Sequence, residues 1–183
     1  MTKDAPTPEK NTLLELSEEI VDLSDRMDAA ENKKDERSIH ESEKRLRRIG
    51  DELVDLLECT TGDDLAFARF MMGSVCSLLG FWQQAEASYR DALGHWPEHV
   101  GILNELFDAQ VAQRKYAEAE NTILASIKHG GETPLILRNY AAVLVHLKKL
   151  NEARVVMINC VARFPDDRES RLFLHRLEES GQR

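Results

Sequence analysis

The chain has 183 residues, of which 42% are hydrophobic and 31% are charged, and its formal net charge at pH 7 is −9. No apolar stretch approaches the roughly 20 residues that cross a bilayer, so we expect no membrane insertion. The negative charge argues against nucleic acid or an anionic membrane as the main partner, since both attract basic patches. Residues 1–59 carry 17 acids and 10 bases, so the acidity belongs mostly to the N-terminal part.

The three cysteines, Cys59, Cys76 and Cys160, show neither a close pair nor the spacing of metal ligands. An odd, scattered set of this kind predicts reduced thiols in a cytosolic protein. The first residues include no apolar run that would indicate a secretory signal. We therefore expect a cytoplasmic location, no metal site and no cofactor.

The first sixty residues predict a loose tail followed by two helical stripes. Residues 1–10 contain two prolines and little apolar surface, which favours a flexible tail. From residue 11, apolar residues follow one another at alternating steps of three and four, as on one face of a helix. These residues are Leu13, Leu16, Ile20, Leu23 and Met27. After a polar stretch at 28–38, a second stripe runs from Ile39 to Leu56.

Two interpretations of this acidic segment, residues 11–61, follow from the polar break. The chain either turns near residues 32–36 to form an antiparallel helical hairpin, or continues as one long helix in a coiled coil. The first stripe, Leu13, Leu16, Ile20 and Leu23, must be buried in either case. It packs onto the rest of the chain or forms a homodimer through residues 11–59, because a stripe alone does not identify what covers it.

A repeat of 34 residues organises the remainder of the chain. Ala85, Ala119 and Ala153 are spaced 34 residues apart twice over. The bulky residues Trp82, Tyr116 and Leu150 precede them by three positions and keep the same step. A fixed period of this length is typical of helical repeat proteins.

The first unit of this repeat resembles the tetratricopeptide repeat (TPR) family. The resemblance is carried by Gly73, Gly80, Trp82, Ala85, Tyr89, Ala92 and Pro97. It divides residues 62–183 into three units, 66–99, 100–133 and 134–167, followed by a capping helix at 168–180. The resemblance implies an all-α fold, a tetratricopeptide-like right-handed helical solenoid with an N-terminal helical hairpin or coiled coil.

The same resemblance implies a groove lined by the first helix of each unit. The groove residues that it implies are Phe67, Phe70, Ser74, Leu78, Asn104, Asp108, Arg138, Asn139 and His146. An alternative is that the N-terminal helices cover Phe67 and Phe70. Tetratricopeptide proteins that hold the carboxylate tails of heat-shock chaperones use groove lysine, arginine and asparagine residues. At the matching places this chain has Phe70, Ser74, Glu105, Leu135 and Asn139, and only the last of these fits.

No set of ionisable residues converges on an enzyme motif, so we expect a protein without catalytic residues. The favoured function is an adaptor or assembly factor that binds a peptide or helix of a partner protein in the groove. One alternative is a small acidic bacterial secretion chaperone of the translocator-binding type, by architectural analogy. Another is a structural oligomer held together by the N-terminal coiled coil.

Overall fold

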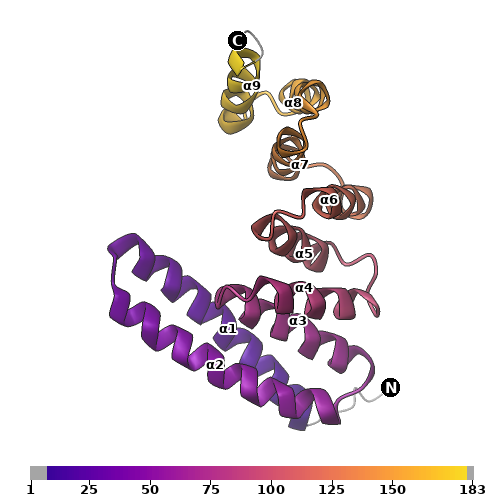
Figure 1. Ribbon diagram of the computed structural model, residues 1–183. Helices are drawn as coiled ribbons and strands as arrows, with labels where there is room; N and C mark the ends of the chain where they lie inside the picture. Colours follow the sequence, from indigo (N-terminus) through magenta and orange to yellow (C-terminus); the bar gives the residue numbers. More distant parts are fainter. Residues whose placement is uncertain (1–7, 181–183) are drawn as a thin grey trace. The chain divides into compact units, whose positions relative to one another are not determined.

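The computed structural model of this chain describes residues 8–180, so residues 1–7 of the predicted tail lie outside the described part. Every regular element in that part is an α-helix (Figure 1). The helices are α1 Pro8–Lys33, α2 Glu36–Cys59, α3 Gly62–Leu78, α4 Trp82–Leu93, α5 Val100–Ala112, α6 Tyr116–Gly130, α7 Pro134–His146, α8 Leu150–Arg163 and α9 Arg168–Ser180. They form two compact units, Met1–Pro97 and Glu98–Arg183.

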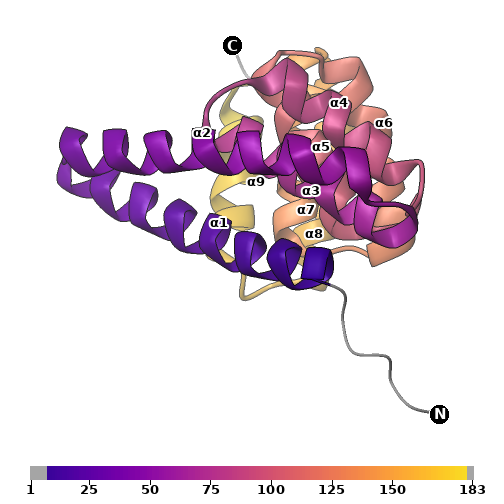
Figure 2. The same cartoon turned by 90° about the horizontal axis from the view of Figure 1, so that it is seen from below.

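The first two helices form a hairpin rather than one continuous helix (Figure 2). The chain turns at Lys34, which adopts a left-handed conformation with φ of 57°. Asp35 then caps α2, because its carboxylate accepts a hydrogen bond from the backbone N–H of Ser38. The turn therefore uses a lysine and an aspartate where the sequence offers no glycine or proline.

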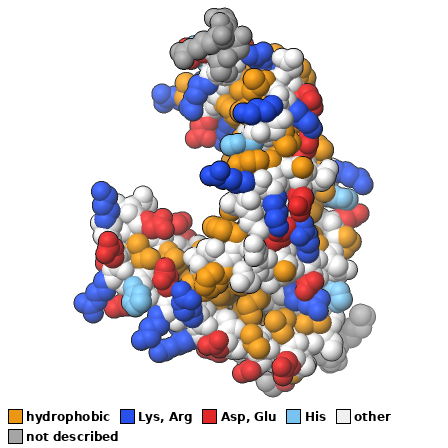
Figure 3. Space-filling view, viewed as in Figure 1, with side chains coloured by type: hydrophobic (Ala, Val, Ile, Leu, Met, Phe, Trp, Pro, Cys, Tyr) orange, Lys and Arg blue, Asp and Glu red, His pale blue; other side chains and the backbone are white. Residues whose placement is uncertain are grey.

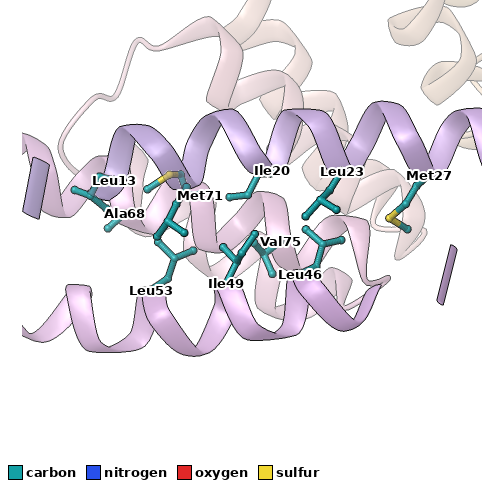
Figure 4. Close-up of a cluster of buried hydrophobic side chains, with 11 residues drawn as sticks. Leu13, Ile20, Leu23, Met27, Leu46, Ile49, Leu53, Ala68, Met71 and Val75 are labelled. Atoms are coloured by element: carbon teal, nitrogen blue, oxygen red, sulfur yellow. The ribbon is translucent and has the colours of Figure 1, made fainter. Parts of the chain in front are cut away.

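The core of the first unit joins this hairpin to α3 (Figure 4). Leu13, Leu16, Ile20 and Leu23 are exposed by at most 6%. They pack with Leu46, Ile49 and Leu53 of α2 and with Ala68, Met71 and Val75 of α3. The unit that contains the hairpin thus also contains the first helix pair of the predicted repeats.

A glycine lets α3 and α4 approach each other closely. A Cβ atom at Gly73 would lie 2.4 Å from the ring of Tyr89. That ring is fully buried, and its hydroxyl lies 3.2 Å from the hydroxyl of Ser77. Gly73 and Tyr89, two positions of the repeat pattern, are therefore the two sides of one packing contact.

The turn inside each repeat has the same conformation three times. Gly80, Arg114 and Lys148, spaced 34 residues apart, have φ of 75°, 60° and 64°. The residue after each donates its backbone N–H to a carbonyl five residues earlier, the pattern that closes a helix with a left-handed residue. Two of the three turns thus place a basic residue where glycine is the easiest choice.

The second unit holds two helix pairs and the final helix. One core cluster joins α5, α6 and α7 around Phe107, Ile123 and Val143. Another joins α7, α8 and α9 around Met157 and Leu177.

The three repeated alanines lie in the interior of the helix packing, and specific residues mark the ends of α6 and α7. Ala85, Ala119 and Ala153 are each fully buried. Thr133 caps α7 with its hydroxyl, and Gly131 ends α6 with φ of 80°.

Candidate partner-binding surfaces

The predicted groove residues of α3 belong largely to the packing of the first unit. The rings of Phe67 and Phe70 stack with centroids 6.5 Å apart, and Phe70 also lies 6.0 Å from the ring of Tyr89. Both phenylalanines and Leu78 pack, half-buried, against the core cluster that contains the hairpin. Ser74 donates its hydroxyl hydrogen bond to the carbonyl of Phe70. These contacts favour the alternative in which the N-terminal helices cover the two rings.

The residues predicted for self-association also lie in this core. Leu13, Leu16, Ile20 and Leu23 face α2 and α3 of their own chain. A dimer formed through these side chains would have to remove them from that core first. Self-association through residues 11–59 stays a prediction, and a different set of residues is available for it.

In the second unit, a stripe of accessible residues runs along α5. Its members follow the helical spacing of three and four and are Gly101, Asn104, Glu105, Asp108 and Ala112. The Asn104 side-chain oxygen accepts a hydrogen bond of 2.6 Å from the hydroxyl of Ser126. Asp108 is exposed and makes no ion pair within residues 8–180, and desolvation by the surrounding protein raises the pKa of its carboxyl group.

An equivalent stripe runs along α7 and contains Arg138, whose side chain is held by contacts with the start of α9. Its members are Leu135, Arg138, Asn139, Ala142 and His146. The Arg138 guanidinium donates to Asp167 and to Ser170 and pairs with Glu169 at 2.7 Å. These contacts fasten the start of α9, so Arg138 acts as a structural residue. Asn139 forms no hydrogen bond with any residue in the described range.

The end of α7 borders a shallow open pocket of about 310 Å³. The ring of His146 stacks on Tyr116 at a centroid distance of 4.2 Å and an interplanar angle of 1°. The residues that line the pocket are Arg114, Lys115, Tyr116, Ala117, Glu118 and Leu147. The sequence pattern gives no signal of this pocket, because its walls come from two separate segments, the α5–α6 turn with the start of α6 and the end of α7 at Leu147.

The two stripes of the second unit form one surface, which we call the α5–α7 face: Asn104, Asp108, Asn139, Ala142 and His146. Helices α5 and α7 are equivalent helices of successive units and share a core with α6, so their stripes point to the same side. In Figure 1, α6 lies to the right of both α5 and α7. The face therefore presents amide, carboxylate and imidazole groups together.

The cysteines and potential metal ligands give no further site within residues 8–180. All three cysteines are free; Cys160 is buried 3.3 Å from the hydroxyl of Ser170, and burial raises the pKa of the Cys76 thiol. In this part of the chain, His, Cys, Asp and Glu side chains do not gather in groups of three that would hold a metal ion. Among the same residues, no helix is long and apolar enough to cross a membrane.

Comparisons with known proteins identify the fold. Neither the protein-family models nor the curated protein sequences match this chain. Among solved structures, it is similar to MamA residues 41 to the end from Desulfovibrio magneticus RS-1, with 13% identity, a TM-score of 0.62, and coverage of 90% of this chain and 86% of that one. It also resembles a thermophilic TPR protein from Thermus thermophilus, with 17% identity, a TM-score of 0.56, and coverage of 92% of this chain and 98% of that one.

A third similar structure is the first TPR of Spaghetti (RPAP3) bound to the HSP90 peptide SRMEEVD. It is 16% identical, has a TM-score of 0.57, and covers 67% of this chain and 100% of that one. The predicted fold class is thus confirmed: the chain is all-α with a tetratricopeptide-like helical solenoid.

Proposed function

We propose that the chain is a non-catalytic adaptor or assembly factor that binds a segment of a partner protein on the α5–α7 face. The general class is supported by the fold, because the similar solved structures are tetratricopeptide proteins and one of them holds a peptide. The location is supported by the side chains of the second unit. The secretion-chaperone alternative stays a prediction, since no contact in the described residues favours it.

The observation that carries the proposal is that several polar groups on this face form no hydrogen bond or ion pair with the described residues of the chain. Asp108 and Asn139 have no hydrogen-bond or ion-pair partner within residues 8–180. The side-chain oxygen of Asn104 accepts a hydrogen bond from Ser126, so the side-chain N–H groups of Asn104 can donate to a ligand. Amide side chains of this kind can bind the backbone of an extended segment, as main-chain recognition requires.

The charges of the face indicate what kind of segment fits. Arg138, the cation of the α7 stripe, is already engaged by Asp167 and Glu169. An acidic tail would therefore meet the carboxylate of Asp108 without a neighbouring cation to offset it. The segment that suits this face is neutral or basic, with a lysine or arginine placed beside Asp108.

Affinity capture from a lysate of the source cells, with quantitative mass spectrometry, tests the proposal. The variant Asp108→Ala/Asn139→Ala removes the two unpartnered groups. Asn159→Ala/Asp166→Ala is the matched control, because it removes the same two residue types at exposed positions that also lack partners in the described range. We expect the first variant to lose a partner that the wild type and the control both retain. If all three proteins capture the same set, the α5–α7 face is not the binding site.

A further inference from the structure

The outward side of α2 carries a row of basic residues, although the first sixty residues are acidic overall. We call it the basic face: Arg37, His40, Lys44, Arg47 and Arg48. All five are exposed, and steps of three and four place them on one side of the helix. Figure 3 shows Lys and Arg side chains gathered over α2.

Arg37 pairs with Glu41 of the same helix at 3.1 Å, whereas the next three cations of the basic face are not held by a carboxylate of the described residues. Lys44 and Arg48 form no ion pair with any residue in the described part. The Arg47 guanidinium lies 5.5 Å from the ring centroid of Phe81, which is 40% exposed. By contrast, Arg45 faces the interior of the hairpin and is held by two carboxylates. The unpaired cations are therefore available to a second molecule.

The outward side of α1 carries the opposite charge. We call it the acidic face: Glu15, Glu18, Asp22 and Asp25. All four are exposed, and Glu15, Glu18 and Asp25 make no ion pair within residues 8–180. Two apolar side chains lie on the same side, Leu14 at 47% and Val21 at 62% exposure. This face therefore offers negative charge together with a small apolar contact.

The two faces match in spacing as well as in sign. Glu15 to Asp25 and Arg37 to Arg47 both proceed by steps of three, four and three residues. Each row therefore spans about 15 Å of helix, so an antiparallel pair of these helices can bring all four positions opposite one another. The two faces of one hairpin cannot contact each other. Leu16 of α1 and Leu46 of α2 lie in the core, so the charged faces are on the opposite, outward sides of the two helices.

We propose that the basic face of α2 binds the acidic face of α1 in a second copy of this chain. The contact joins two different surfaces, so it is head-to-tail and builds a series of oligomers rather than one closed dimer. The net charge of −9 on each copy opposes the contact and keeps it weak. Near 0.1 M salt, screening removes most of this long-range repulsion, whereas near 1 M it also removes the attraction between the faces.

Sedimentation velocity of the full chain at about 0.1 M and about 1 M salt tests the proposal. We expect the mean mass to rise with protein concentration at the lower salt and to return to that of one chain at the higher salt. Lys44→Glu/Arg48→Glu and Glu18→Lys/Asp25→Lys should each weaken association by about tenfold or more, because attraction is replaced by repulsion. An equimolar mixture of these two variants restores complementary faces and should recover the oligomers.

The control variant Lys128→Glu/Arg176→Glu changes the net charge as much as Lys44→Glu/Arg48→Glu does, at exposed positions of the second unit. It should associate nearly as the wild type does. A wild-type chain that stays monomeric at both salt concentrations overturns the proposal and leaves the basic face to an acidic segment of another protein. A mixture of the two charge-reversed variants that stays monomeric overturns it as well.

Discussion

Replacing Gly73 by alanine should destabilise the first unit, because α4 passes too close for a side chain. The new Cβ would lie 2.4 Å and 2.6 Å from Cε1 and Cδ1 of Tyr89, well inside van der Waals contact. The ring cannot move aside easily, since it is fully buried and packs against Phe70. Overpacking of this kind costs about 1–3 kcal/mol. It is partly offset by the higher helix propensity of alanine, worth about 1 kcal/mol.

Gly50→Ala is the matched control, because Gly50 also lies inside a helix of the first unit. Its added Cβ would meet only Val75 Cγ1, at an ordinary 3.7 Å. The propensity gain is common to both variants, so their free energies of unfolding should differ by about 1–3 kcal/mol in favour of Gly50→Ala. Urea unfolding followed by circular dichroism measures this difference. Equal stability of the two variants would refute the close α3–α4 contact.

Three further changes test other parts of the fold. Ala119→Leu should cost about 1–3 kcal/mol by overpacking, whereas Ala117→Leu, at an exposed position of the same helix, should stay within about 0.5 kcal/mol in urea unfolding. Thr133→Ala removes the cap of α7 and should cost about 1 kcal/mol, measured in the same way. Hydrogen bonds from Arg45 hold the pKa of Glu19 below its usual range. The Arg45–Glu19 pair therefore stabilises the fold above the unfolded pKa, near 4.3, and that stability is lost as the pH falls through the lower folded value. Thermal melts from pH 7 to pH 3 should show a smaller decline for Glu19→Gln than for the wild type.

The repeat could be predicted because its packing depends on side-chain size at fixed positions. Ala85, Ala119 and Ala153 are buried where a larger side chain does not fit, and this constraint produces the 34-residue period. The left-handed conformations of the turns inside the repeats were harder to predict from the sequence. Gly80 shows its left-handed backbone by residue type, whereas Arg114 and Lys148 adopt the same conformation without that signal.

The contacts of the predicted groove residues were harder to predict. The spacing of residues along a helix shows which of them share a face, but it does not show which other residues they contact. Arg138 lies on the expected stripe, yet Asp167 and Glu169 reach it from a segment 29 and 31 residues later. Phe70 lies on the expected helix, yet the core that includes the N-terminal hairpin covers much of it. Both outcomes depend on contacts between distant segments, which one sequence does not specify.

Photo-crosslinking tests the central claim, partner binding on the α5–α7 face, most directly. A photoreactive amino acid would be placed at Asn139, on that face, or at Asn159, an exposed position of α8. After irradiation in the source cells, we expect position 139 to crosslink to a defined segment of one partner protein and position 159 not to do so. Equal crosslinking at both positions, or crosslinking at position 159 alone, would contradict it.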